Sequence, residues 1–141
     1  MSKPTLAQLQ DFLRSEFPQS SVTLESISES VTWVRQSVDN SHLRPGGTVS
    51  GPVLMAVADV AMYLGLLAQI GIVPLAVTTN LSINFLRKPA ADRDILGECR
   101  LLKVGKTLAV GEVSLYSEGS ADPVAHVVCT YAIPPRDKLA N

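Results

Sequence analysis

Apolar residues near the start of the chain recur with the period of a helix. Thr5 and Gln8 fit a capping box, in which the two side chains satisfy backbone N–H groups at the start of a helix. Residues 4–17 are therefore expected to form a short amphipathic helix, whose apolar face carries Leu6, Leu9, Phe12, Leu13 and Phe17. Two strand-like segments follow, over about residues 22–27 and 31–38.

The longest apolar segment is almost uniform, and it follows the loop-like stretch "DNSHLRPGGTVSG". Pro52 suits the first position of a helix, so we expect Gly51 to be the N-cap. The helix is expected to run to about Gln69, with Gly71 as its C-terminal cap. Because this helix is apolar nearly all round, it is predicted to be buried on most sides.

Four strand candidates come after the helix, and turn-like separators divide them. The pattern predicts one central buried helix followed by a long antiparallel meander, with a strand or two before the helix. A curved sheet wrapped around the helix would cover it, so we expect a single α+β domain over residues 1–141. The four candidate strands are residues 75–86, 95–104, 107–117 and 124–133.

Composition narrows the class of protein. A net charge of −1 and a hydrophobic content of 46% describe a globular protein and argue against nucleic acid as a partner. The two cysteines, Cys99 and Cys129, match no metal or redox spacing. The N-terminus has no apolar signal core, so we expect a cytoplasmic protein with both thiols reduced and buried.

Asp59 is the only charged residue between Pro45 and Leu86. A carboxylate is costly to bury unless it is paired, hydrogen-bonded or protonated. At the centre of a membrane helix it would cost about 3 kcal/mol, so we expect no membrane span although residues 53–73 are long enough for one. Two interpretations of Asp59 remain: a structural acid bonded to backbone or a hydroxyl, or a functional carboxylate.

The loop and the helix together resemble the PaaI-like acyl-CoA thioesterases. The motif of that family runs Asn-x-x-Gly-x-x-His-Gly-Gly, with an Asp after six further residues. Gly47, Gly51 and Asp59 fall on its first glycine, on the glycine after the histidine and on the acid. The segments "VADVAMY" and "NFLRKPA" also look like the family's helix and a strand end, so the resemblance covers roughly residues 40–133.

The resemblance implies a hotdog fold, in which a curved antiparallel sheet wraps around one long central helix. It also implies a metal-independent hydrolase with no cofactor, since the CoA thioester is the substrate. Asp59 would act as general base or nucleophile, and the backbone N–H of Gly51 would bind the developing oxyanion. The family often carries a Ser or Thr near the next strand that orients the nucleophile or water. We assign this role to Thr78, although threonine is also common in strands.

Three positions depart from the motif. Arg44 stands at the family's asparagine, Ser50 at the histidine and Pro52 at the second glycine. Arg44 would bind an acyl carboxylate or a CoA phosphate, or would simply be a solvated loop residue. Ser50 would donate a hydrogen bond in place of the histidine, or would satisfy N–H groups at the helix start. The resemblance places Gly47 in the same substrate-binding loop.

The distance between two of these residues predicts an oligomer. Gly51 and Asp59 are eight residues apart, which is about 12 Å along a helix. One thioester carbonyl cannot lie within about 3 Å of both residues of the same chain. If both serve one site, they come from different subunits, so we expect a homodimer with two composite sites. The family implies the same arrangement, often with dimers paired into tetramers.

Further residues are assigned to substrate binding. Met62 and Tyr63 on the helix suit a small to medium acyl or aryl group. CoA carries phosphates, so a basic rim of Arg87, Lys88 and Lys106 would bind it, although basic residues at strand ends are also common for other reasons. The chain has two histidines without metal-ligand spacing, so no metal site is expected.

Two competing functions come from other classes. A hotdog dehydratase or hydratase needs a histidine paired with an acid, and no histidine lies in or near the central helix, which counts against it. A non-catalytic acyl-CoA binding or sensing protein remains as the alternative, because the family's histidine and asparagine are both replaced. Ligand binding without turnover would identify that alternative.

Overall fold

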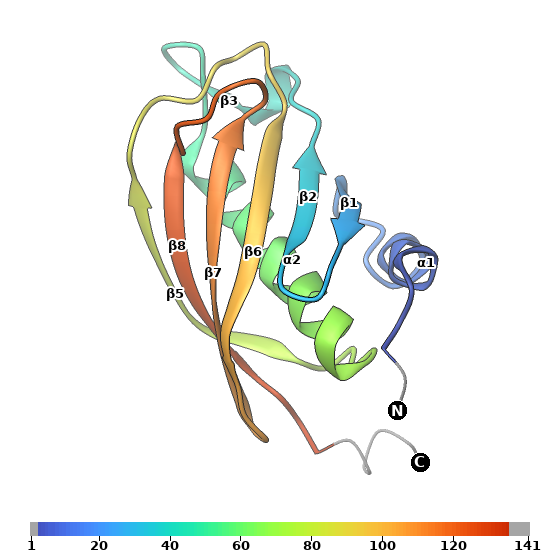
Figure 1. Cartoon of the computed structure of the whole chain (residues 1–141). Coiled ribbons are helices and arrows are strands. Elements are labelled where there is room, and N and C mark those ends of the chain that lie inside the picture. The colour runs from blue at the N-terminus through green and yellow to red at the C-terminus, as the bar shows by residue number, and fades with distance from the viewer. Residues whose placement is uncertain (1–2, 136–141) are drawn as a thin grey trace.

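The computed structural model describes residues 3–135, which form a large antiparallel sheet with one long helix packed against it (Figure 1). The expected curved sheet around one central helix, the hotdog architecture, is confirmed. A short 3-10 turn and a two-stranded ribbon precede the long helix. The elements are α1 (Leu6–Glu16), β1 (Val22–Ile27), β2 (Thr32–Gln36), η1 (Asn40–His42), β3 (Leu43–Arg44), β4 (Thr48–Val49), α2 (Gly51–Ile70), β5 (Val77–Phe85), β6 (Ile95–Val104), β7 (Leu108–Ser117) and β8 (Ala125–Ala132).

The sheet has six strands in the order β1-β2-β6-β7-β8-β5. Strands β6, β7 and β8 form the expected meander, but the expectation of an uninterrupted meander after the helix was wrong for β5. This strand pairs with β8 rather than with β6, because the connection over residues 86–94 crosses over to the other side of the sheet. As a result, β5 lies at an edge, and no strand of the described chain covers its outer side.

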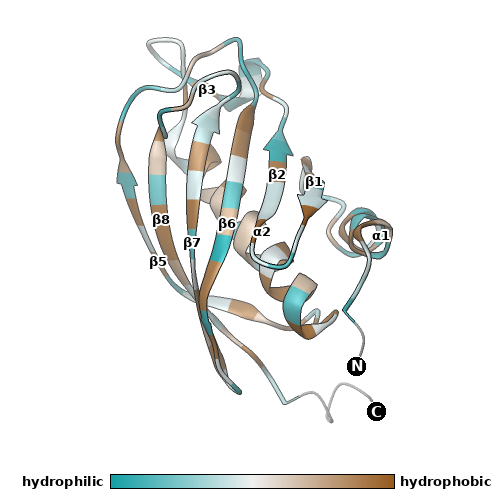
Figure 2. Cartoon of the chain, in the orientation of Figure 1, coloured by the Kyte–Doolittle hydropathy of each residue, from teal (hydrophilic) through white to brown (hydrophobic). Residues whose placement is uncertain are grey.

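Helix α2 forms the centre of the core. Its buried residues pack against the sheet and α1. Figure 2 shows brown, apolar residues along the helix and along the strands that cover it. The helix is long and apolar enough to span a membrane, but 72% of its most apolar window is buried inside the protein, as is typical of a core helix. The predicted cap was wrong by one residue: Ser50 is the N-cap and Gly51 is already helical. Gly71 ends the helix as predicted, with a φ of 99°.

Helix α1 begins with the predicted capping box. The Thr5 hydroxyl accepts from the backbone N–H of Gln8, and the backbone N–H of Thr5 donates to the Gln8 side chain at 2.8 Å. The apolar face buries Leu9, Phe12 and Leu13 against β1 and α2. The C-terminal end of α1 is therefore fixed beside the middle of α2, where the candidate site lies.

Candidate active site

The carboxylate of Asp59 contacts two hydroxyl groups from neighbouring strands. Thr78 on β5 donates its Oγ1–H to Asp59 Oδ1. The phenol of Tyr131 on β8 lies 2.9 Å from the same oxygen and 3.2 Å from the backbone carbonyl of Asp59. Asp59 is half-buried, whereas Tyr131 is buried. The costly carboxylate in the apolar helix is thus hydrogen-bonded and still reaches solvent.

A β-bulge decides which threonine faces the carboxylate. Thr78 and Tyr131 lie directly opposite each other in the β5–β8 ladder, so their side chains share the face toward α2. The register shifts between Thr78 and Asn80, which leaves Thr79 as the extra residue. The Thr79 hydroxyl donates instead to the backbone carbonyl of Thr130 at 3.3 Å. The structure therefore places Thr78, the predicted residue, at the acid.

A cavity of about 430 Å³ opens beside this carboxylate. The ring of Tyr63 stacks on that of Tyr131 at 6.0 Å, and its hydroxyl donates to the carbonyl of Pro74 at 2.9 Å. Burial raises the pKa of Tyr63, and the charge of Glu16 raises it further. The only charged residues in the lining are acids, and the full set is Glu16, Phe17, Gln19, Asp59, Tyr63, Pro74, Ala76, Val77, Thr78 and Tyr131.

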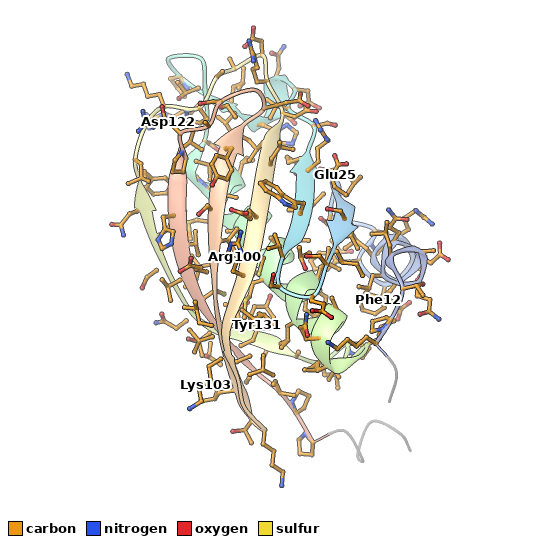
Figure 3. All side chains as sticks on the ribbon, viewed as in Figure 1. Phe12, Glu25, Arg100, Lys103, Asp122 and Tyr131 are labelled. Atoms are coloured by element: carbon orange, nitrogen blue, oxygen red, sulfur yellow. The ribbon has the colours of Figure 1, made fainter. Side chains whose placement is uncertain are left out.

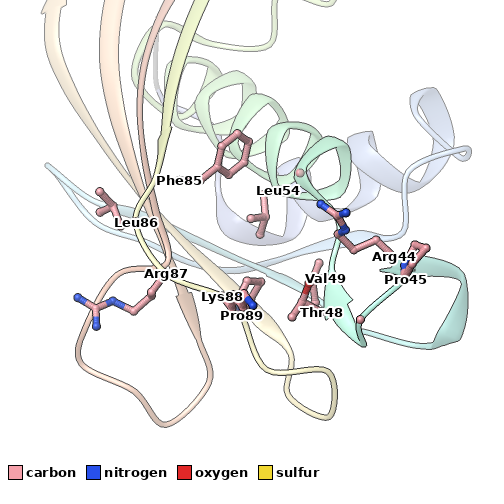
Figure 4. Close-up of a pocket in the computed structure, with 12 residues that line it drawn as sticks. Arg44, Pro45, Thr48, Val49, Leu54, Phe85, Leu86, Arg87, Lys88 and Pro89 are labelled. Carbon is pink, nitrogen blue, oxygen red and sulfur yellow. The ribbon is translucent and has the colours of Figure 1, made fainter.

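A second cavity, of about 580 Å³, lies at the N-terminus of α2 (Figure 4). Arg44 lies near the first turn of the helix, so its charge adds to the positive end of the helix dipole. The side chain of Arg87 points away and donates to the carbonyl of Pro123 at 3.0 Å. The charged residues in this lining are all basic, and the full set is Arg44, Pro45, Gly46, Thr48, Val49, Gly51, Leu54, Phe85, Leu86, Arg87, Lys88 and Pro89.

The two cavities have no lining residue in common. Asp59 belongs to the acidic cavity and Gly51 to the basic one, as their separation along α2 predicts. Gly51 is packed under the ring of Phe85, because a Cβ at Gly51 would lie 3.2 Å from that ring. Within one chain, therefore, Asp59 and the N–H of Gly51 do not face the same cavity.

Gly47 and Ser50 were assigned to substrate binding, but neither residue lines one of the two cavities. Gly46 and Gly47 have φ values of 101° and 76°, which the turn between β3 and β4 requires, and the N–H of Gly47 donates to the carbonyl of Arg44 at 3.0 Å. Gly47 does not line either cavity, so it shapes the loop that carries Arg44. The side chain of Ser50 makes no capping hydrogen bond.

Two residues assigned to substrate binding lie elsewhere in the chain. Met62 is fully buried, and a Cβ at Gly111 would lie 2.5 Å from its sulfur, so it packs in the core. Lys106 lies in the hairpin between β6 and β7, at the opposite end of the sheet from the basic cavity. In Figure 3, Lys103 marks the end of the sheet near this hairpin, and Asp122, between β7 and β8, marks the opposite end. Neither residue therefore lies beside Arg44 and Lys88 within one chain.

Sequence reasoning did not identify Tyr131. Its segment alternates like any half-buried strand, and only the pairing of β8 with β5 brings its hydroxyl to Asp59.

The two cysteines are free and buried as expected, and burial raises the pKa of each thiol to about 12. Among residues 3–135, no cluster of three or more His, Cys, Asp or Glu side chains could hold a metal ion.

Comparison with known proteins places this arrangement in a family. The family model described as "Thioesterase superfamily" matches residues 46–124. A solved structure of a candidate thioesterase from Silicibacter sp. TM1040 is 46% identical, with a TM-score of 0.87 and 96% of each chain covered. None of the curated proteins matches the chain.

Two more distant structures share the fold. Zebra fish thioesterase superfamily member 2 is 22% identical, has a TM-score of 0.80, and covers 93% of this chain and 99% of its own. A mutant of the phenylacetic acid degradation protein PaaI from Thermus thermophilus is 21% identical, with a TM-score of 0.72 and coverages of 84% and 98%. The family match, the close relative and the hotdog architecture together show that the chain belongs to the thioesterase superfamily.

Proposed function

We propose that the protein is an acyl-CoA thioesterase in which Asp59 is the general base or nucleophile. The observation that carries this proposal is the Asp59 carboxylate, which is held by two hydroxyls at the wall of a cavity in an otherwise apolar helix. A purely structural acid would not need to line a cavity beside the core. Membership of the thioesterase superfamily supplies the reaction class.

The carboxylate can drive hydrolysis by two routes. As a base, Asp59 takes a proton from a water whose oxygen attacks the thioester carbonyl carbon, and it returns this proton to the departing CoA thiolate. As a nucleophile, it attacks the carbon itself, and water then hydrolyses the mixed anhydride. In either route, negative charge develops on the carbonyl oxygen and requires a hydrogen-bond donor. The N–H of Gly51, at the positive end of α2, has no hydrogen-bond partner in the described residues 3–135.

The donor would come from a second copy of the chain. Between the two ends of the proposed site, α2 has an exposed stripe formed by Pro52, Met55 and Ala56. A two-fold axis close to Met55 would bring Asp59 of one chain to Gly51 of the other. The free edge of β5 supports the same dimer, because it presents exposed Val77 and Phe85 to a neighbouring strand.

Each cavity suits one end of an acyl-CoA molecule. Arg44 and Lys88 in the basic cavity would bind CoA phosphates, which leaves the cavity beside Asp59 for the acyl group. The latter is lined by tyrosines and by Glu16, with no basic side chain among its lining residues. A neutral small to medium acyl or aryl group fits this lining better than an acyl group that ends in a carboxylate.

Thiol release from a panel of acyl-CoAs tests the proposal. We expect turnover by the wild type and a loss of about a hundredfold or more in kcat for Asp59→Asn at equal folded concentration. Cys99 and Cys129 will react little with the thiol reagent used, because burial raises the pKa of both. Equal turnover by the mutant excludes the catalytic role, and tight acyl-CoA binding without turnover identifies a binding protein instead.

Mixing two inactive variants tests whether the site is shared. Gly51→Pro removes the N–H donor, and Ser50 already has the extended backbone that precedes a proline, with φ −72° and ψ 153°. A mixed dimer of Asp59→Asn and Gly51→Pro chains contains one site with both native groups. We therefore expect activity to return when the two variants are unfolded together and refolded. If activity does not return, although each variant folds and dimerises, the shared site is wrong.

A further inference from the structure

We infer that Tyr131 is a positioning residue: with Thr78 it holds Asp59 by Oδ1 alone and so leaves Oδ2 as the reacting oxygen. Two hydroxyl donors converge on Oδ1, and within residues 3–135 no hydrogen bond is formed to Oδ2. This inference rests on the proposed thioesterase function, since it assigns the two oxygens of the same carboxylate to different roles.

The Tyr131 proton has two possible acceptors, and the geometry favours one of them. The phenol oxygen is 2.9 Å from Asp59 Oδ1 and 3.2 Å from the Asp59 carbonyl. A charged acceptor at the shorter distance makes the stronger hydrogen bond, so the proton goes to Oδ1. Burial raises the pKa of Tyr131 far above its usual value, and the negative charge of Asp59 adds to this shift. The raised pKa keeps the phenol protonated, and so a donor, at neutral pH.

The phenol itself has little freedom to move. Tyr131 is only 3% exposed, and its ring stacks on Tyr63, whose own hydroxyl is fixed to the Pro74 carbonyl. The ring of Tyr63 is packed in turn against Phe12 and Phe17 at 6.0 and 6.5 Å. The hydroxyl of Tyr131 is thus supported from α1 through a column of aromatic rings.

This support matters for the reaction because the Asp59 carboxylate could otherwise rotate about its Cβ–Cγ bond. With both donors on Oδ1, rotation about the Cβ–Cγ bond would break two hydrogen bonds at once. Oδ2 is therefore held in one direction, and its lone pairs are not used by another donor of the described chain. A base or nucleophile that is fixed in this way needs no reorientation in the transition state.

Kinetics of Tyr131→Phe tests the inference, because this variant keeps the ring and removes only the hydroxyl. We expect kcat to fall about tenfold with KM within about twofold of the wild type, since the ring that lines the cavity is kept and the lost hydroxyl is bonded to Asp59. Thr78→Val is expected to behave similarly. The double variant should lose more than the product of the two single losses, because the carboxylate then has no donor on Oδ1. Tyr116→Phe is the matched control, since its hydroxyl reaches Glu98 at 3.4 Å on another part of the sheet.

An infrared measurement separates this inference from the proposed function. The carboxylate band of Asp59 is identified in protein with 13C-labelled aspartate as the band that Asp59→Asn loses. We expect its antisymmetric stretch to shift in Tyr131→Phe and to stay in place in Tyr116→Phe. If the wild type hydrolyses no acyl-CoA but the band shifts, the proposed function fails and the Tyr131 contact stands. If the wild type is active while the band and kcat of Tyr131→Phe are unchanged, the role of Tyr131 is wrong.

Discussion

The two cavities beside α2 differ in charge although one helix contributes to both. The cavity at the helix start is lined by Arg44 and Lys88, whereas the cavity beside Asp59 is lined by Glu16 and aromatic rings. Under the proposed function, this difference would orient the substrate, with its anionic end at the helix start and its neutral end beside Asp59. Charge changes in each cavity should therefore affect different ends of the substrate.

Among changes that leave Asp59 in place, the largest effect is expected from reversing the charge in the basic cavity. Arg44→Glu should raise KM for an acyl-CoA about thirtyfold, because it replaces attraction to a phosphate by repulsion. The same variant should hydrolyse the acyl-pantetheine thioester, which lacks the nucleotide phosphates, with nearly unchanged KM. Steady-state kinetics on the two thioesters measures the difference. If both KM values rise equally, Arg44 does not bind the nucleotide phosphates of CoA.

A smaller effect is expected from the acidic cavity. Glu16→Lys should raise kcat/KM for a dicarboxylic acyl-CoA relative to a neutral one of equal length about tenfold. The cause is the loss of a negative charge from a cavity in which the acyl group would lie. Competition between the two thioesters in one reaction gives the ratio directly. Arg14→Glu, on the same helix but outside this lining, is the control and should leave the ratio unchanged.

The next effect concerns the size of the acyl group. Phe17 packs its ring edge against Tyr63 and lines the same cavity. Phe17→Ala enlarges the cavity, so kcat/KM for bulky acyl groups should rise about threefold relative to short ones. A homologous series of acyl-CoAs measures this ratio. An unchanged chain-length profile would place the acyl group elsewhere.

The smallest effect on activity is expected at the far end of α1. Thr5→Ala removes the cap and should lower the free energy of unfolding by about 1 kcal/mol, because a helix N–H loses its acceptor. Denaturant unfolding measures this loss, while kcat/KM should remain at the wild-type value. A change in acyl preference would show that the position of α1 itself sets the shape of the acidic cavity.

The sequence allowed part of this site to be predicted. Asp59 is the one charge in a long apolar run, so its position required an explanation before any fold was known. Thr78 and the basic residues around Gly51 followed from the resemblance. Tyr131 was missed because its role depends on the register between β5 and β8, which local sequence does not encode. Met62 was misassigned because a helix that is apolar all round gives no signal for which face lines a cavity.

The fold was easier to predict than the site. The capping box, the buried helix and strand β6 over Ile95–Val104 were all read from local patterns. The place of β5 in the sheet was not predicted. The pattern indicates that a strand exists but not which strands it pairs with. Long-range pairing is set by how the whole core packs, so it emerges only in the structure.

The bulge at Thr79 has a consequence for sequence alignment. If Thr79 were absent, Thr78 would still lie opposite Tyr131, and Asn80 would still pair with Thr130 in a regular ladder. A chain one residue shorter at this point can thus present the same two hydroxyls to its acid. Relatives can gain or lose this residue without changing the site, so aligning them by counting positions back along the strand would pick the wrong threonine.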